Sequence, residues 1–303
     1  MLPYLFLLLT LLHALPIGAQ PAGDSLDVEA HAGGRGTHPG NSIPAFIHAV
    51  TLGVTTLEMD CVISQDGQVV VSHDPFMNAR FMLTPSGQEI LPGEEETYNL
   101  FRMPYDSIRR YQLGVKPDAE FPEQKTVKTY KPLLSEVIDS VETYVRAHQL
   151  KPVRYNIEIK SYRDADHYNP DPKTFAERVV AVVKHYKVEK RVYVQSFDVR
   201  PLQYTREQYP MLSLSYLISK NDEHTLLENL EELGFTPEVY SPEYPMVDSE
   251  MMKEAKKYGM KIVPWTVDRE ADWRMLVELG VDGIITNYPE KLLQLITEGQ
   301  AKR

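Results

Sequence analysis

The sequence is poor in cysteine and has no excess of basic residues. Cys61 is the only cysteine among 303 residues, so an internal disulfide is excluded, and a chain of this length can bury a core without one. Cysteine clusters and histidine-rich spacings of the kind that hold zinc are also missing. The net charge of −11 argues against a nucleic-acid partner, which would require a basic surface. It does not exclude an anionic substrate, because local charge decides that.

Positive charge is missing from the N-terminal segment too, where the sequence is strongly apolar. Residues 2–17 are almost entirely apolar, and Gly18 and Ala19 precede a suitable cleavage point at Gln20. We therefore expect residues 1–19 to be a secretory signal peptide. A membrane anchor is the alternative, but the run is shorter than the roughly 20 residues that a span needs. The expected location is secreted or periplasmic, without stable membrane insertion.

The mature chain, 20–303, is expected to form one domain in which strands and helices alternate. Eight strands are expected near residues 28, 58, 157, 194, 215, 239, 263 and 284. Alternating strands and helices indicate parallel strands, and eight such units form an α/β fold of the (β/α)8 TIM-barrel type. A doubly wound sheet is the alternative. The barrel is favoured because polar residues recur at the strand ends all along the sequence.

One stretch interrupts this alternation. Residues 65–68 carry a hairpin turn signal after the second strand, and an apolar return strand follows them. Residues 75–131 are then rich in Pro, Gly, Glu and Tyr and show no sustained periodicity. We expect this stretch to be a small insertion after the second strand that lies over one end of the domain.

Two carboxylates lie side by side on the second expected strand. Glu58 and Asp60 are two positions apart inside the apolar run 55–63. This spacing places both on one face of a strand, with Met59 on the other. Two acids on a buried face repel each other unless a positive charge, such as a cation, lies between them. The pattern therefore indicates a site.

Glu158 and Lys160 repeat this spacing at the end of the next barrel strand. Glu158 completes a set of three carboxylates with Glu58 and Asp60, and such a set suits one hard divalent cation, Ca²⁺ or Mg²⁺. Lys160 would be positively charged beside the metal and suits a phosphate oxygen. A structural ion pair between Glu158 and Lys160 is the alternative.

Two histidines bracket the first two carboxylates in the sequence. His31 ends the first expected strand, and His73 follows the return strand of the hairpin. Two imidazoles beside one metal and one cationic group suit general acid–base catalysis on a phosphodiester. One would deprotonate the attacking oxygen and the other would protonate the leaving alkoxide, while the metal would neutralise charge on the non-bridging oxygens.

These residues belong to a longer series of motifs, through which the chain resembles the glycerophosphodiester phosphodiesterases, in particular secreted bacterial members. The motifs are His31-Ala-Gly-Gly-Arg-Gly, Pro39-Gly-Asn-Ser-Ile-Pro-Ala-Phe, Glu58-Met-Asp, Asp66-Gly-Gln-Val-Val-Val-Ser-His-Asp, Asn156-Ile-Glu-Ile-Lys, Gln195-Ser-Phe-Asp, Trp265-Thr-Val-Asp and Asp282-Gly-Ile-Ile-Thr-Asn. Together they cover essentially the whole mature chain. Their order and spacing are more specific than any single motif.

The resemblance implies a (β/α)8 barrel with a small inserted segment and one divalent metal. It implies hydrolysis of small-molecule glycerophosphodiesters to glycerol 3-phosphate and an alcohol. Carried over position by position, it implies that His31 and His73 are the acid–base pair. It implies that Lys160 contacts the phosphate and that Trp265 lines the glycerol side of the pocket. The implied metal ligands are Glu58, Asp60 and Glu158.

The chain departs from the family pattern at two positions of one loop. Ala32 stands where the family usually has Arg, and Gly40 stands where it usually has Glu. A cation and an anion are thus missing together, so the local charge is roughly preserved. Our hypothesis is that Arg35, in the same loop, supplies part of the lost phosphate contact.

Two other functions stay open at this stage. The first is a phosphodiesterase for a related substrate, such as a phospholipid head group or a glycerophosphoryl-modified glycan. The second is a barrel that binds ligands without catalysis, which is disfavoured because both histidines and all three carboxylates are present. An exported protein meets more Ca²⁺ than a cytosolic one, which favours Ca²⁺ slightly over Mg²⁺. The sequence leaves the alcohol group of the substrate and the oligomeric state open.

Overall fold

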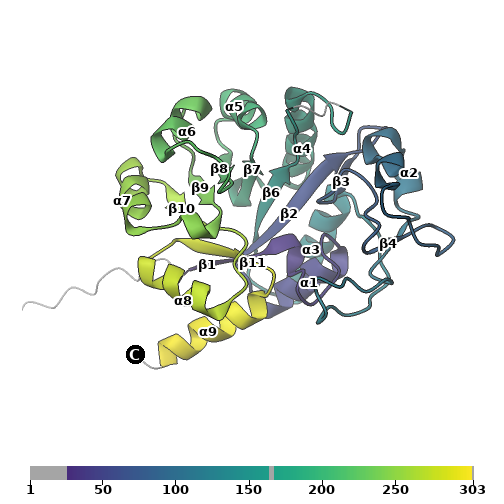
Figure 1. Cartoon of the computed structure of the whole chain (residues 1–303), viewed down its shortest axis with the longest axis horizontal. Coiled ribbons are helices and arrows are strands. Elements are labelled where there is room, and N and C mark those ends of the chain that lie inside the picture. The colour runs from purple at the N-terminus through teal and green to yellow at the C-terminus, as the bar shows by residue number, and fades with distance from the viewer. Residues whose placement is uncertain (1–25, 164–166, 302–303) are drawn as a thin grey trace, which may run out of the picture.

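The computed structural model of the chain describes residues 26–163 and 167–301. The expected signal peptide, residues 1–19, lies outside the described residues. In the described part, eight parallel strands form the centre of the molecule and helices surround them (Figure 1). The strands are β1 (Asp27–Ala30), β2 (Thr56–Ile63), β6 (Arg154–Ile159), β7 (Val192–Ser196), β8 (Ser213–Ile218), β9 (Val239–Pro242), β10 (Lys261–Ile262) and β11 (Gly283–Thr286).

The strands follow one another around a ring. Their order is β10-β9-β8-β7-β6-β2-β1-β11, with parallel pairing along this path. The two ends of the path are joined by backbone hydrogen bonds, because Asp282 N donates to Ile262 O over 2.9 Å and Ile285 N to Pro264 O over 3.0 Å. The two end strands of a doubly wound sheet would stay apart, so the structure confirms the predicted (β/α)8 barrel.

The helices cover the outside of the barrel and follow the strands in sequence. Those longer than one turn are α1 (Ile43–Leu52), α3 (Leu134–Ala147), α4 (Pro172–Tyr186), α5 (Val199–Gln208), α6 (Leu226–Leu233), α7 (Ser249–Tyr258), α8 (Glu270–Leu279) and α9 (Pro289–Ala301). In α1, Ser42 caps the N-terminus by accepting from Ala45 N, and Gly53 ends the helix at a φ of 83°, which is a favourable conformation for glycine. Within the described residues, no helix has both the length and the apolarity needed to span a bilayer.

The main hydrophobic core lies between the barrel and the helices. On β2, Leu57, Met59 and Cys61 are fully buried in this core. Because side chains alternate along a strand, Glu58 and Asp60 between them point into the barrel. The alternation that predicted two acids on one face therefore also explains how an apolar strand carries them into the interior.

Residues 75–131 extend to one side of the barrel beyond β3 (Val69–Val71), which pairs antiparallel with β2 (Figure 1). The segment contains a short helix, α2 (Tyr105–Ile108), and a small antiparallel sheet of β4 (Met82–Leu83) and β5 (Gln112–Leu113). Residues such as Met82 and Ile108 form a second hydrophobic cluster, which also includes Val62 of β2 and Val70 of β3 and so packs the segment against the barrel. Its last part lies against the loop that follows β1, where Gln124 Nε2 donates to Arg35 O over 2.9 Å.

Candidate active site

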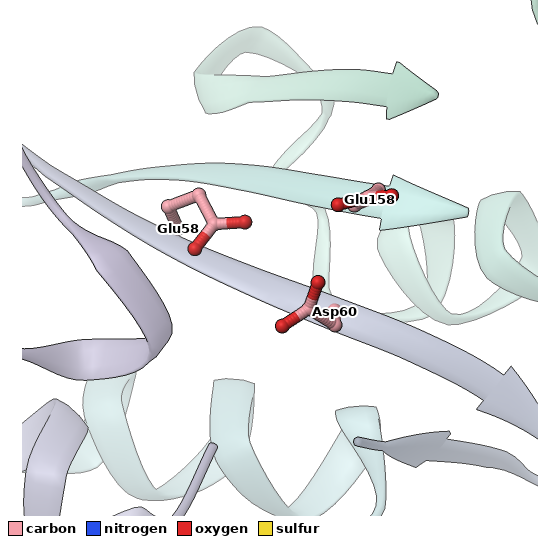
Figure 2. Close-up of side chains that lie close together, drawn as sticks. All are labelled: Glu58, Asp60 and Glu158. Atoms are coloured by element: carbon pink, nitrogen blue, oxygen red, sulfur yellow. The ribbon is translucent and has the colours of Figure 1, made fainter. Parts of the chain in front are cut away.

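The three predicted carboxylates converge at the barrel interior. Glu58 and Asp60 come from β2, and Glu158 comes from the neighbouring strand β6, where it pairs in register with Asp60 (Figure 2). One carboxylate oxygen from each residue can be chosen so that all three lie within 4.8 Å of one another. All three side chains are buried. Two neighbouring parallel strands, β2 and β6, thus supply all three carboxylates of this cluster.

The electrostatics of the three carboxylates favour a cation among them. Burial, followed by the negative charge of Asp60, raises the pKa of Glu58 well above its ordinary value. Burial likewise raises the pKa of Glu158, to about 7, although Lys160 opposes the shift. Burial alone would also raise the pKa of Asp60, but Lys160 and the two histidines outweigh it and lower that pKa. Two of the three buried carboxylates thus resist ionisation without a further positive charge beside them, and a hard divalent cation would supply that charge.

Lys160 lies next to two of the carboxylates. Its Nζ is 3.0 Å from Glu158 Oε1 and 3.6 Å from Asp60 Oδ1. Burial opposes the charged form of the lysine, but the two carboxylates outweigh burial and raise the pKa of Lys160. The side chain is therefore a positive charge held beside these two carboxylates.

Two groups from the loop after β1 hold the carboxylates in place. Asn41 donates from Nδ2 to Asp60 Oδ2 over 2.7 Å and accepts from Asp60 N over 3.3 Å. The backbone N–H of Ala32 donates to Glu58 Oε2 over 2.9 Å. Sequence analysis did not identify Asn41 as a site residue. The residue stands two positions before α1, where an asparagine suggests only a possible helix cap, and its contact with Asp60 across 19 positions shows the role in the site.

His31 lies on the same side of the cluster as Glu58. Its Nε2 is 4.0 Å from Glu58 Oε2, and its Nδ1 is 2.6 Å from Asn287 Oδ1. Asn287 in turn donates from Nδ2 to the Asp268 carboxylate over 2.7 Å. A carboxylate only accepts, so the amide nitrogen of Asn287 faces Asp268 and its oxygen faces the histidine. Nδ1 of His31 is then the donor, which leaves the lone pair on Nε2, the nitrogen that faces the site.

His73 lines the same cavity as His31 and is more exposed, with about half of its side chain accessible. Its Nδ1 is 2.9 Å from Asp74 Oδ1, and Asp74 also accepts from Asn78 over 2.8 Å. Burial would raise the pKa of Asp74, but the hydrogen bond from His73 and the charge of Lys131 outweigh it and lower that pKa. The ionised Asp74 fixes the ring of His73 with Nε2 free for chemistry.

The two histidines, the three carboxylates and Lys160 line one cavity of about 130 Å³. Trp265 forms part of its apolar wall, where its ring meets Phe197 edge to face with centroids 5.3 Å apart. The Trp265 indole is held by a hydrogen bond from Nε1 to Ser241 O over 2.9 Å. The full lining consists of His31, Glu58, Asp60, His73, Glu158, Lys160, Gln195, Phe197, Leu217, Trp265, Thr266 and Ile285.

Arg35 is the one predicted site residue that does not line this cavity. Its guanidinium lies over the ring of Phe121, 4.6 Å from the centroid, with Nη2 3.7 Å from Asp118 Oδ2. It lines a second cavity of about 260 Å³ that adjoins the first at His73. The structure therefore brings seven of the eight predicted residues together and places Arg35 beside them.

Sequence analysis also left out the residues that orient the two histidines. Asn287 and Asp268 are polar residues at the ends of expected strands, and both belong to motifs of the resemblance. Asp74 follows His73 directly. Lys131, which is buried with Nζ 2.6 Å from Ser72 Oγ, stands in a stretch without periodicity. No signal in the sequence singled it out.

Comparison with known proteins places the chain among phosphodiesterases. Residues 31–291 match the model of the glycerophosphoryl diester phosphodiesterase family. A glycerophosphodiester phosphodiesterase of Caldanaerobacter subterraneus subsp. tengcongensis is 30% identical over 278 residues, which cover 90% of this chain and 98% of that protein.

Solved structures show the same fold. A Silicibacter pomeroyi DSS-3 protein, provisionally described as a glycerophosphoryl diester phosphodiesterase, is 27% identical with a TM-score of 0.82, covering 91% of this chain and 94% of its own. An Oleispira antarctica phosphodiesterase, solved in complex with the product sn-glycerol-3-phosphate, is 20% identical with a TM-score of 0.70, covering 89% of this chain and 96% of its own.

Proposed function

The chain belongs to the glycerophosphoryl diester phosphodiesterase family and is a glycerophosphodiester phosphodiesterase, and we propose that its hydrolysis depends on a divalent cation and on two histidines. The products are glycerol 3-phosphate and an alcohol. The observation that carries this proposal is the single cavity that three clustered carboxylates and two imidazoles line together.

Glu58, Asp60 and Glu158 would hold the metal. Their oxygens lie within 4.8 Å of one another, and an all-oxygen donor set of this kind suits Ca²⁺ or Mg²⁺. When bound, the cation would neutralise charge that develops on the non-bridging phosphate oxygens. The absence of thiolate ligands from the cluster argues against softer metals.

His31 is suited to the role of general base. Asn287 fixes the proton on Nδ1, and burial lowers the pKa of His31, so Nε2 is an acceptor near neutral pH. It would take the proton of the attacking oxygen as that oxygen forms its bond to phosphorus.

His73 is suited to the role of general acid. Its Nδ1–H is held by Asp74 over 2.9 Å, which leaves Nε2 as the nitrogen that can transfer a proton. When the bond from phosphorus to the alcohol oxygen breaks, His73 would donate its Nε2 proton to that oxygen. His31 has then gained a proton and His73 has lost one. Release of a proton from His31 to solvent and uptake of one by His73 restore both rings.

Lys160 and the apolar wall would bind the substrate. The ammonium of Lys160, beside Glu158 and Asp60, is placed to contact a phosphate oxygen. Trp265 and Phe197 offer an apolar surface that would contact the carbon backbone of the glycerol. The cavity volume of about 130 Å³ accommodates a small group of this size.

A turnover screen tests the proposal directly. Several glycerophosphodiesters are incubated with the purified protein after EDTA treatment, and with Ca²⁺ or Mg²⁺ added back. Glycerol 3-phosphate is measured enzymatically. Turnover that requires one of the two metals supports the proposal, and full turnover in EDTA would exclude metal dependence.

We further propose that the protein is exported. The apolar run 2–17 followed by Gly18 and Ala19 supports a cleavable signal peptide. N-terminal sequencing of protein recovered from the periplasm or medium of an expressing bacterium should begin at Gln20. Retention of the full-length chain in the cytoplasm would contradict this.

A further inference from the structure

The cavity that adjoins the site at His73 is here called the side cavity, and it has a volume of about 260 Å³. It lies between the loop after β1 and the inserted segment. Its lining is Ala32, Arg35, Pro39, Gly40, Asn41, His73, Asp74, Asn78, Arg80, Phe81, Leu113, Gly114, Asp118, Glu120, Gln124 and Lys131. His73, the proposed acid for the leaving alcohol, lines both cavities. The alcohol part of a bound diester would therefore extend into the side cavity.

The carboxylates of the side cavity already have partners. Arg80 Nε is 3.0 Å from Asp118 Oδ1, and Arg80 also pairs with Glu120. Asp74 accepts from His73 and from Asn78. These acids are therefore poorly placed to bind a positively charged ligand unless Arg80 or His73 moves.

Two cations of the side cavity make few hydrogen bonds, although Arg35 is loosely ion-paired with two carboxylates. Nη2 of Arg35 is 3.7 Å from Asp118 and 3.9 Å from Glu120, both beyond hydrogen-bond distance. Among the described residues, the guanidinium of Arg35 makes no hydrogen bond, although it could donate five. Lys131 is buried, and its Nζ makes one hydrogen bond, to Ser72 Oγ.

Small residues make room for Arg35 in this position. A Cβ atom at Gly40 would lie 3.1 Å from Cβ and Cγ of Arg35 and 3.3 Å from Cβ of Ala32, closer than most such contacts. Phe121, on the other side, supports the guanidinium at 4.6 Å from its ring centroid. The Arg35 side chain is thus held at the wall of the side cavity, where its donors keep hydrogen bonds to offer beyond its loose ion pairs with Asp118 and Glu120.

We propose that the side cavity binds the alcohol part of the substrate and favours an alcohol that carries a carboxylate or a phosphate, which Arg35 and Lys131 recognise. This inference rests on the proposed function. Burial lowers the pKa of Lys131 to about 8 although Asp74 and Asp60 oppose the shift. These two carboxylates therefore stabilise the ammonium only in part, and a bound anion would stabilise it further. Bidentate contacts with Arg35 would add geometric selectivity.

The test compares substrates that differ by one anionic group. The glycerophosphodiesters of serine and of ethanolamine differ by a carboxylate, and those of glycerol phosphate and of glycerol differ by a phosphate. We expect the ratio of kcat/KM values within each pair to favour the anionic member by at least about tenfold. The pair with the larger ratio identifies which anion is preferred.

Variants connect this preference to the cavity. Arg35→Gln should reduce the ratio at least about fivefold, whereas Arg35→Lys should retain part of it. Arg110→Gln serves as the matched control, because Arg110 is an exposed arginine of the same inserted segment and lines neither cavity. Thermal unfolding of each variant reports whether it is folded.

Binding measured without turnover separates this inference from the proposed function. Isothermal titration calorimetry in EDTA compares the affinities of the serine and ethanolamine diesters for the intact protein. Tighter binding of the serine diester that Arg35→Gln removes supports the inference even if no diester is hydrolysed. Equal affinities, a preference for the choline diester, or a preference unchanged by Arg35→Gln would overturn it, even where turnover confirms the hydrolase.

Discussion

Asn287 Oδ1 lies 2.6 Å from Nδ1 of His31, across 256 positions of the sequence. Asp268 orients the amide of Asn287 from behind, and the amide sets the proton on Nδ1 of the ring. We therefore expect Asn287→Ala to lower kcat about ten- to hundredfold, because the ring loses its orientation and its fixed tautomer. Steady-state kinetics with a glycerophosphodiester measure this.

The loss should be in kcat more than in KM, since Asn287 does not line the cavity. Asn221→Ala is the control, because Asn221 is exposed in the loop after β8 and should leave both constants unchanged. An Asn287→Ala variant with nearly normal kcat would show that the orientation of His31 does not depend on this contact.

The second prediction concerns His73, the proposed general acid. General acid–base catalysis typically contributes ~10²–10⁴-fold, so His73→Ala should lower kcat by at least about a hundredfold. Half of the His73 side chain is exposed, so the fold should be retained, which a thermal unfolding curve checks. His185→Ala, at an exposed position on α4, is the matched control. Retention of most of the activity would remove His73 from the mechanism.

The parts of the site that could be predicted are those that depend on local periodicity. Glu58 and Asp60 interrupt an apolar strand at every second position, and Glu158 does the same on β6. Alternate side chains of a strand point to the same face, and parallel strands bring their carboxyl ends together. These two rules predict the barrel and the metal cluster, and the structure confirms the barrel.

The parts that could not be predicted depend on contacts between distant segments. Lys131 reaches Ser72 across 59 positions, and Asn41 reaches Asp60 across 19. The position of Arg35 depends on Phe121, which belongs to the inserted segment without periodicity. No local pattern fixes how that segment folds back on the loop after β1, so the side cavity could be found only from the structure.

The third prediction concerns metal binding and stability. A ligand that binds only the folded protein, at a hundred times its Kd, should add about 2.7 kcal/mol to the free energy of unfolding. Ca²⁺ or Mg²⁺ should therefore raise the Tm of the EDTA-treated protein by several degrees, about 2–4 °C per kcal/mol for a domain of similar size. Differential scanning calorimetry measures the shift.

Glu158→Gln should remove most of this increase. It keeps the size of the side chain but removes one of the three charged ligands. Glu177→Gln, at an exposed position on α4, should respond to the metal like the original protein. If Glu158→Gln shows the full increase in Tm, the metal binds elsewhere.

The fourth prediction is a loss of stability in weak acid, caused by His38. The centroid of its ring lies 4.1 Å from that of the His48 ring, and 7% of the residue is exposed. Burial, followed by the charges of His48 and Lys125, lowers the pKa of His38 from 6.5 to about 4. Between these two pH values the unfolded chain binds more protons than the folded protein, so the free energy of unfolding falls as the pH falls.

His38→Phe should make this pH dependence weaker. Phenylalanine keeps an aromatic ring against His48 but does not titrate, so the variant should lose less stability between pH 6.5 and 4.5, by on the order of 1 kcal/mol. Urea unfolding at several pH values measures the difference. His224→Phe is the matched control, because His224 is exposed and its side chain contacts Asp222 far from this pair. Parallel curves for His38→Phe and the original protein would mean that His38 is protonated as readily in the folded protein as in the unfolded chain.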